Sequence, residues 1–530
     1  MAHLRDSNAV VVHCDTDYIR AIHGITDLFN KPSITLRACY AVPSISEKPT
    51  EPNGDLQMEG ETATPAPAPE ATSKSGWIIG DDLTNAEKEV GFSNKYEIRW
   101  PFRPSTSVDD WEGLEYVLLH LYTLLGITIS SNATSLLLIP PPTATLSLSK
   151  QATYTQIAFE VLNTPVFSLI PSPLASLYAL GATSGMIIHV GAEETSVFVV
   201  TDSIVRWECS TTVKIGELHC RKFLEDLLLE DELLDKELNS IKEGLTKEEK
   251  LTYIKEISDF VWTECTGDDL EVPFLKSGNK SIVSSNLTGI GGGGTGVVGA
   301  EKEDDSFDVA KKLVGDNAPP AANPSHKSKK QQAAIAAAAA KSAQAAADAA
   351  AAAAALPQPI DTITITIPSL PGKEIQLGPV RHRLCEPLLL GKEPGGDTVW
   401  EAVGRSIDNA SLSLGEKLSL WDGIGVVGEL SRIRSFSPAL ITYLSPYLLS
   451  SEDLTSDCQP SKIRLLSSAP DYFANFQNQT NEIITFLGGS LISKVAFLDQ
   501  QGQSGNKLSI NKIDYNQKGP EAIYNVSQEQ

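Results

Sequence analysis

The sequence is poor in basic residues and has no long apolar run. Its 530 residues include 43 lysines and arginines against 67 aspartates and glutamates, which gives a formal net charge of −24 at pH 7. Contacts to phosphate groups need a basic surface, so this balance argues against direct binding to nucleic acid or to an acidic membrane. No apolar run approaches the roughly 20 residues that span a bilayer, and the N-terminus lacks a signal-peptide pattern. We therefore expect protein partners and a cytosolic or nuclear protein.

Cysteine patterns that would point to a metal or redox site are also lacking. The seven cysteines are scattered along the chain and form no C-x-x-C pair. Buried or free thiols in a reducing compartment are the simplest interpretation of such spacing. We predict neither a metal site nor a bound cofactor.

Two segments lack the apolar residues that a folded core needs. The composition as a whole, 41% apolar and 21% charged, is that of a globular protein of two to four domains. Residues 46–76 form a loop rich in proline, glutamate and alanine, and residues 277–359 form an insert rich in glycine and alanine. The insert contains a G-x-G-x-x-G match, but no strand precedes it and no helix follows, which favours a linker over a dinucleotide-binding loop. We expect both segments to be low-complexity and disordered.

The remaining sequence contains the same strand–turn–strand pattern twice, about 175 residues apart. The first copy covers residues 9–22 and the second covers residues 185–200, and each has β-branched runs on both sides of a polar corner. Further strands alternate with helices, which indicates βαβ units and a largely parallel sheet. We predict strands at 34–44, 96–100, 135–139, 166–170, 363–367, 374–378 and 423–427, and helices at 110–125, 154–162, 173–180, 215–234, 246–262, 400–407 and from about 438. The helix at 110–125 should be capped by Asp109 or Asp110, and its apolar side should consist of Leu114, Val117, Leu118, Leu121, Leu124 and Leu125.

Several motifs, in this order, resemble the actin family. They are the segments 77–82 (WIIGDD), 100–101 (WP), 110–115 (DWEGLE), 155–165 (TQIAFEVLNTP), 176–179 (SLYA) and 487–491 (LGGSL), of which 155–179 is the most specific. The resemblance implies an α/β fold that is actin-like (ribonuclease H-like), a duplicated two-domain fold with a central cleft. It implies a first half from residues 1–45 and 77–184, a second half from 185–276 and 360–480, and a C-terminal segment, 481–530, that returns to the first half.

The C-terminal part narrows the resemblance within the family. Residues 470–473 (PDYF), 482–488 (EIITFLG) and 515–522 (YNQKGPEA) are similar to fungal actin-related subunits of SWI/SNF-class chromatin remodellers, including RSC. This resemblance implies a non-catalytic subunit in the nucleus. Its expected partners are the helicase-SANT-associated helix of the remodelling ATPase, a second actin-related protein and other remodeller subunits, with no direct contact to nucleic acid or membrane.

The resemblance also implies a nucleotide site at the two corners. Its expected residues are His13, Asp15 and Thr16 from the first corner and His189 and Gly191 from the second. The resemblance also places Gly428 near the adenosine and gives Gln156 the role of orienting the attacking water. A phosphate clamp needs glycines, because backbone N–H groups must approach the oxygens, and a carboxylate to order the metal ion. Most of the glycines are lost here. The carboxylates of Asp15, Asp17 and Glu193 stand where donors are needed, and each like-charge contact costs on the order of 4 kcal/mol. We predict a vestigial site and no enzyme activity.

Three alternatives remain open at this site. Asp15 and Asp17 could hold a cation that screens their charges. His13 and His189 could form a metal or acid–base pair, although histidines that fill a vacated pocket are the simpler interpretation. The chain could also be an ATP-binding or ATP-hydrolysing actin-like protein of the cytoskeleton.

A groove for a partner helix is implied by the same resemblance. The residues of the family that line one wall of this groove correspond to Tyr178, Ala179, Gly181 and Thr183. Small residues beside an aromatic ring form a floor for the apolar face of a helix. The alternative is that Tyr178 and Ala179 are simply the packed end of a helix.

Overall fold

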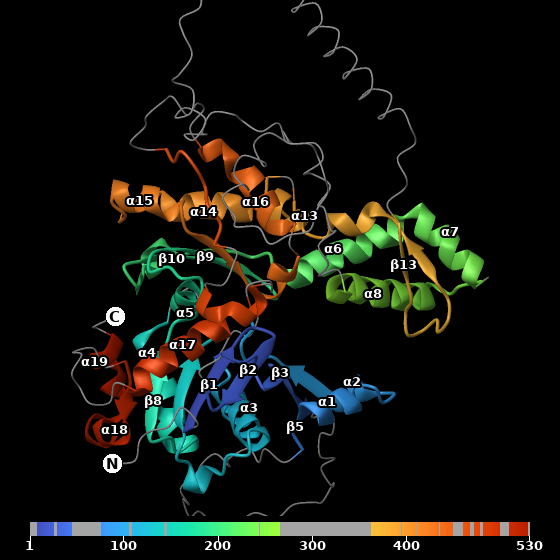
Figure 1. Ribbon diagram of the computed structural model, residues 1–530. Helices are drawn as coiled ribbons and strands as arrows, with labels where there is room; N and C mark the ends of the chain where they lie inside the picture. The colour runs from blue at the N-terminus through green and yellow to red at the C-terminus, as the bar shows by residue number, and fades with distance from the viewer. Residues whose placement is uncertain are drawn as a thin grey trace, which may run out of the picture. The chain divides into compact units, whose positions relative to one another are not determined.

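A computed structural model gives the fold, with the larger part of the chain described (Figure 1). The structure describes residues 8–25, 29–44, 76–104, 109–142, 146–242, 244–264, 362–393, 395–409, 411–433, 435–448, 459–466, 471–476, 481–498 and 508–527. The predicted loop at 46–76 and the insert at 277–359 lie outside the described residues, apart from Gly76. No described helix combines the length and the apolar character that crossing a bilayer requires.

The two predicted hairpins each lie within a larger sheet, and the two sheets have the same strand order. The first sheet runs β16-β8-β7-β1-β2-β3, with β1 antiparallel to β2 and parallel to β7. The second runs β11-β10-β9-β15, with β9 antiparallel to β10 and parallel to β15. In the second sheet, a parallel bridge joins Ile424 of β15 to Leu465. Leu465 therefore lies beside β15 as β8 lies beside β7 in the first sheet. The strands are β1 (Ala9–Cys14), β2 (Tyr18–His23), β3 (Ile34–Arg37), β7 (Ser135–Ile139), β8 (Val166–Leu169), β9 (Gly185–Val190), β10 (Thr195–Thr201), β11 (Ile204–Val205), β12 (Thr211–Val213), β15 (Ile424–Val427) and β16 (Ile510–Asn511).

This repeat confirms the predicted duplicated α/β fold, although the sheets are mixed rather than largely parallel. Two smaller sheets complete the β-structure. One has the strand order β5 (Ile78–Ile79), β4 (Tyr40–Pro43) and β6 (Tyr96–Arg99), and the other pairs β13 (Ile363–Ile365) with β14 (Ile375–Leu377). The helices are α1 (Asp81–Ala86), α2 (Phe92–Lys95), α3 (Trp111–Leu124), α4 (Leu148–Gln156), α5 (Ser172–Ala179), α6 (Glu217–Glu230), α7 (Glu232–Ile241), α8 (Lys247–Glu264), α13 (Glu386–Leu390), α14 (Val399–Ile407), α15 (Leu414–Leu420), α16 (Phe436–Leu444), α17 (Ile484–Leu498), α18 (Lys512–Lys518) and α19 (Tyr524–Ser527). Short 3₁₀ turns include η6 (Glu429–Arg432) and η9 (Asn481–Ile483).

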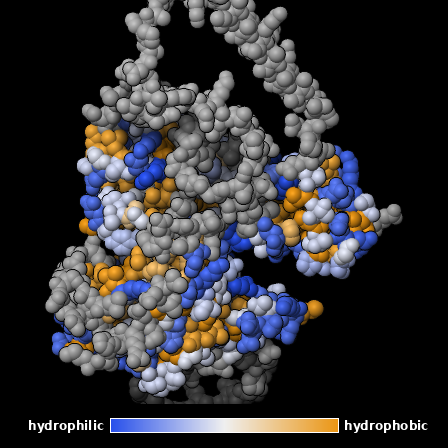
Figure 2. All heavy atoms as spheres, in the orientation of Figure 1, coloured by the Kyte–Doolittle hydropathy of each residue, from blue (hydrophilic) through white to orange (hydrophobic). Residues whose placement is uncertain are grey.

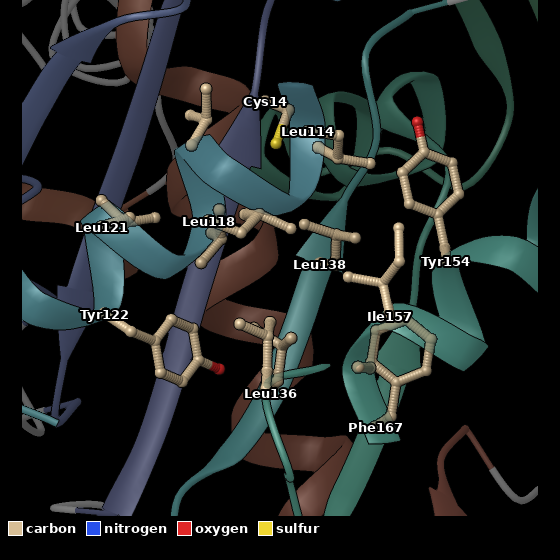
Figure 3. Packing of buried hydrophobic residues seen from close by; sticks show 14 of the residues in the cluster. Cys14, Leu114, Leu118, Leu121, Tyr122, Leu136, Leu138, Tyr154, Ile157 and Phe167 are labelled. Carbon is tan, nitrogen blue, oxygen red and sulfur yellow. The ribbon is translucent and has the colours of Figure 1, made fainter. Parts of the chain in front are cut away.

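Both faces of the first sheet are covered, because successive side chains of β1 point to opposite sides. Val10, Val12 and Cys14 pack into a cluster with α3 and α4. Figure 3 shows Leu114, Leu118 and Leu121 of α3 in this cluster together with Leu136 and Leu138 of β7, and the three leucines of α3 are buried, as predicted. Ala9 and Val11 face the opposite way, into a cluster with α5 and α17. The end of β1, where the first corner begins, is therefore held from both sides.

Local hydrogen bonds explain which predicted helix ends are right. Of the two predicted caps, Asp109 and Asp110, it is Asp110 that caps α3, since its carboxylate accepts from the amide of Gly113 at 2.9 Å. The predicted helix at 154–162 begins earlier, at Leu148, because Ser147 provides the cap. The predicted single helix at 215–234 is wrong, since the chain breaks at Asp231, whose side chain caps α7. Leu124, predicted to face the core, is 50% exposed because it lies in the last turn of α3.

Candidate functional site

The corner between β1 and β2 contacts the corner between β9 and β10. The Asp15 carboxylate lies 3.0 Å from Nε2 of His189, and both side chains are buried. The backbone N–H of Ala192 donates to the hydroxyl of Thr16 over 3.3 Å. The structure therefore brings Asp15 and Thr16 of the first corner into contact with the second corner through side-chain and backbone atoms of the protein itself.

Backbone N–H groups at both corners already donate to other protein atoms. The amide of Thr16 donates to the Asp15 carboxylate at 2.7 Å, and the amide of Asp15 donates to the carbonyl of Tyr18 at 2.8 Å. The amide of Gly191 donates to the carbonyl of Glu194 at 3.0 Å. A phosphate would have to replace these bonds, and each buried donor that loses its partner costs about 1–3 kcal/mol.

Helix α6 begins beside the second corner, and backbone N–H groups of its first turn donate to carbonyl groups of that corner. The amide of Glu217 donates to the carbonyl of Gly191, and the amide of Leu218 donates to the carbonyl of Ala192, both at 2.9 Å. The first N–H groups of a helix have no partner within the helix and often bind anions. Here two of them bind the corner instead, so they are not free to bind a phosphate.

A buried arginine lies beside the first corner and binds three carboxylates. Arg20 of β2 is 2% exposed and contacts Glu429 of η6 directly. Its guanidinium also lies 3.2 Å from the carboxylate of Glu482 and 3.9 Å from that of Asp15. Arg432 lies 3.3 Å from the second oxygen of Glu429. We call these five residues the Arg20 cluster; it links β2 to η6 and η9.

Asp17 has a cationic partner of its own. Its carboxylate accepts from Nε and Nη2 of Arg103 at 3.0 and 2.6 Å. The guanidinium of Arg103 stacks on the ring of Trp100, 3.6 Å from its centroid. The Asp15 and Asp17 charges are thus compensated by protein cations, which the like-charge estimate from the sequence did not include. Among the described residues there is no group of three metal-binding side chains.

The two histidines of the corners differ in their surroundings. His13 is 2% exposed, and neither ring nitrogen has a hydrogen-bond partner within the described residues. Burial lowers the pKa of His13 to about 3, so its ring is neutral at physiological pH. Burial alone would raise the pKa of Asp15, but the contact with His189 lowers it below its ordinary value, so the carboxylate stays ionised. His189 therefore binds the corner, whereas His13 fills space.

Gln156 and Gly428 are the remaining two residues predicted for the nucleotide site. Gln156 is exposed at the end of α4, and its amide donates to Glu160 at 2.9 Å, one turn along the same helical segment. Gly428 has φ +97°, and a Cβ atom there would lie 2.6 Å from the carbonyl oxygen of Val190. Gly428 is therefore required by the close approach of two backbones, whether or not a nucleotide binds.

The predicted partner-helix groove involves the end of α5. Tyr178 is half-buried, whereas Gly181 and Thr183 are exposed just beyond the helix. Ala179 is fully buried among the apolar residues of the α5 and α17 cluster, so its methyl group does not line an open surface. The groove stays a prediction that depends on the other three residues.

Glu217, at the start of α6, is a buried carboxylate that the sequence did not single out. It is 7% exposed, and its carboxylate accepts from Nε of Arg221 at 2.7 Å. Burial raises the pKa of Glu217 from 4.5 to about 7, Arg221 opposes this rise, and the charges of Asp17 and Glu429 add to it. The native state therefore holds a proton on Glu217 that the unfolded chain releases at lower pH.

We expect Glu217→Gln to remove a pH dependence of stability. Because the native pKa is the higher one, the free energy of unfolding falls as pH rises from about 4.5 to about 7, by about 3 kcal/mol in total from this group. Glutamine does not ionise, so the variant should lose this decrease and be the more stable protein at about pH 8. Urea unfolding between about pH 5 and about pH 8 measures the slope. Glu225→Gln on the same helix serves as the control, and an unchanged slope in Glu217→Gln would contradict the assignment.

Besides Glu217, sequence reasoning missed Arg103 and the members of the Arg20 cluster other than Asp15. One signal was available, since Arg20 is a cation among the apolar residues Ile19, Ala21 and Ile22 of β2, and a buried charge needs a partner. The partners could not be identified, because Glu429 and Glu482 lie 409 and 462 positions further along the chain.

Comparison with known proteins gives three matches. The model of the actin family matches residues 5–256. The SWI/SNF and RSC complexes subunit arp9 of Schizosaccharomyces pombe is 24% identical over an alignment of 569 positions that covers 99% of this chain and 99% of that protein. Actin-related protein 7 of Saccharomyces cerevisiae is 30% identical over 108 residues, which cover 20% of this chain and 22% of that protein.

Proposed function

We propose that the protein is a non-catalytic actin-related subunit of a nuclear chromatin-remodelling complex of the SWI/SNF or RSC class. The premise is that residues 5–256 of this chain are an actin-family domain. The end-to-end similarity to a SWI/SNF and RSC subunit supports this assignment, because it extends over the C-terminal part that the family model does not match. We further infer the division into halves at 1–45 with 77–184 and 185–276 with 360–480, and a C-terminal segment, 481–530, that returns to the first half.

The observation that carries the proposal is the direct contact between the two corners. Asp15 binds His189, and Ala192 binds Thr16, so protein atoms already join the corners that would otherwise clamp phosphates. The Arg20 cluster adds ion pairs between β2, η6 and η9. The contacts that a nucleotide would supply between the corners are replaced by the chain, which gives a folded subunit that needs no ATP.

The proposed partners are the helicase-SANT-associated helix of the remodelling ATPase, a second actin-related protein and other remodeller subunits. The helix would lie on the surface at Tyr178, Gly181 and Thr183, where an aromatic ring is adjacent to small or polar exposed residues. The formal charge of −24 favours protein contacts over direct contact with DNA.

The test is co-expression of the full chain with that long helix and the second actin-related protein, followed by affinity purification on the helix. We expect the chain to co-purify, and Tyr178→Glu to reduce its yield because the variant places a charge in an apolar contact. Leu233→Glu, on the 54% exposed Leu233 of α7, is the control and should leave the yield unchanged. A chain that elutes alone would contradict the proposal.

The same purified chain is then titrated with labelled ATP and magnesium. We expect no saturable binding up to about 100 µM, a concentration that corresponds to a binding free energy of about −5.5 kcal/mol. Tighter binding would favour the alternative of an ATP-binding actin-like protein, and phosphate release would favour an ATPase.

A further inference from the structure

Arg20 is a buried cation beside the two corners. It is the cross-strand partner of His13 in the pairing of β1 with β2, so both side chains project from the same face of the sheet. Its side chain is 2% exposed. A guanidinium carries five N–H donors in a planar fork that matches the oxygens of carboxylates and phosphates, and it stays charged when it is buried. A cation in this position therefore needs anionic partners, and the chain provides them.

The two glutamates bound to Arg20 come from turns in distant parts of the chain. Glu429 is the first residue of η6, directly after Gly428, and its carboxylate contacts the guanidinium. Glu482 belongs to η9, just before α17, and its carboxylate lies 3.2 Å from the guanidinium. Neither glutamate belongs to the sheet that carries Arg20. Both therefore approach Arg20 from outside that sheet, as a ligand approaches a binding site.

The Arg20 cluster holds more carboxylates than its cations compensate. Its two arginines and three carboxylates give it a formal charge of −1. Burial raises the pKa of Glu429, the charge of Arg20 opposes this rise, and the charges of Glu482 and Asp15 add to it. The carboxylates therefore repel one another while they share one buried cation. A neutral group in place of the Glu482 carboxylate leaves a cluster without net formal charge, so an anion from solution no longer meets a net negative charge.

One nitrogen of the Arg20 guanidinium makes no hydrogen bond within the described residues. Both glutamates accept from Nη2, whereas Nη1 has no hydrogen-bond partner, because the Asp15 carboxylate at 3.9 Å is too distant. A single oxyanion can accept from Nη1 and Nη2 together, and such paired bonds are among the strong ones that arginine makes. Neither glutamate uses this capacity of Arg20.

Glu482 is the member of the cluster that faces solvent. Its side chain is 32% exposed, whereas those of Glu429 and Arg20 are 10% and 2% exposed. The position at which an anion from solution reaches Arg20 is therefore that of Glu482.

From this arrangement we propose that Arg20 is an anion-binding site that the chain fills with its own carboxylates, Glu429 and Glu482. Its ligand is a small oxyanion, a carboxylate or a phosphate, that takes the place of Glu482 when this carboxylate is removed. In the intact protein the two glutamates are an autoinhibitory contact, since they occupy the donors that such an anion needs. The inference rests on the proposed function, in which the two corners need no nucleotide. An ion pair that serves stability alone predicts no affinity for a free anion.

The test measures the melting temperature of the full chain carrying Glu482→Ala. Alanine removes the carboxylate and leaves space beside Nη2 of Arg20. The variant is heated in sodium chloride, in sodium acetate and in sodium phosphate at an equal ionic strength of about 0.1 M. We expect acetate or phosphate to raise its melting temperature by at least about 2 °C more than that of the unchanged chain, because a ligand that binds only the native state stabilises it. The larger of the two rises identifies the preferred anion.

Two control variants separate anion binding from general salt effects. Glu482→Gln is the matched control, because glutamine removes the charge but fills the space of the carboxylate, and it should respond to the anions as the unchanged chain does. Glu232→Ala on α7 is the surface control, since Glu232 is 87% exposed and pairs with Lys236 at 3.7 Å. Figure 2 shows hydrophilic residues at the surface of the part of the molecule that carries α6, α7 and α8. Loss of a carboxylate from this surface should give no anion-specific rise, because exposed pairs contribute little.

Equal rises in Glu482→Ala and Glu482→Gln, or no rise in Glu482→Ala, would overturn the inference. So would a rise that persists when Arg20→Met is added to Glu482→Ala. If Glu482→Ala is not soluble, Glu482→Asp replaces it, because aspartate withdraws the carboxylate by one methylene group, and the absence of an anion-specific rise there counts against the inference in the same way. Such a failure, with co-purification on the partner helix retained, overturns this inference alone, whereas tight ATP binding by the unchanged chain contradicts the proposed function.

Discussion

Gly488→Ala is expected to destabilise the protein by about 3 kcal/mol or more, because it forces apart two helices of the core. Gly488 lies in α17 where that helix crosses α5, and a Cβ atom there would lie 1.8 Å from the carbonyl oxygen of Ala175. That oxygen belongs to the backbone of α5, so it cannot move without moving the helix. A lower melting temperature and a lower soluble yield measure the effect.

Two other helical glycines, Gly489 and Gly415, show what the size of the destabilisation should depend on. At Gly489 the nearest atom to an added Cβ is the tip of the Ile139 side chain, 2.3 Å away, which can rotate, so Gly489→Ala should cost less. At Gly415, in α15, nothing lies within 4 Å of an added Cβ. Gly415→Ala should be neutral or stabilise the helix by up to about 1 kcal/mol. Equal melting temperatures for Gly488→Ala and Gly415→Ala would contradict the tight crossing of α5 and α17.

Arg20→Met is expected to destabilise the protein by about 3–5 kcal/mol, the range measured when one partner of a buried ion pair is removed. The substitution keeps an apolar side chain of similar length but leaves Glu429, Glu482 and Asp15 without their shared cation. Urea or thermal unfolding measures the loss. Because the cluster joins β2 to η6 and η9, faster hydrogen exchange in these three segments should accompany it.

A second substitution distinguishes the ion pair from simple packing. Arg20→Met combined with Glu429→Gln removes both charges of the shortest contact. The double variant should therefore lose less unfolding free energy than the sum of the losses in the two single variants. Arg405→Met is the matched control, because Arg405 pairs with Asp397 at 3.0 Å and both side chains are exposed. Such a surface pair contributes about 1 kcal/mol at most. Additive effects of Arg20→Met and Glu429→Gln would show that the pair does not couple.

Elements with a strong local pattern could be predicted from the sequence. The β-branched runs of both hairpins, and the spacing of Leu114, Leu118 and Leu121 in α3, depend only on neighbours within a few positions. Asp110 caps α3 through a bond to Gly113, three residues away. The split between α6 and α7 was missed because Asp231 interrupts a continuous pattern of leucines without glycine or proline.

The candidate site could be predicted in position but not in electrostatics. The resemblance placed Asp15, Thr16, His189 and Gly191 at two corners, and these corners are in contact. From the sequence, the carboxylates of Asp15 and Asp17 suggested repulsion. In the structure each has a cationic partner, and for Asp17 that partner is Arg103, 86 positions away.

The sequence by itself determined the types of most strands and helices, the repeated hairpin and the resemblance to actins, because each of these is written in short-range order along the chain. Only the tertiary structure decided that the corner amides are already bonded, that Arg20 neutralises carboxylates more than 400 positions away, and that Gly488 touches Ala175. The physical reason is that the energy of a buried charge or of a close backbone contact is set by the atoms around it. Those atoms come from segments that the fold alone brings together.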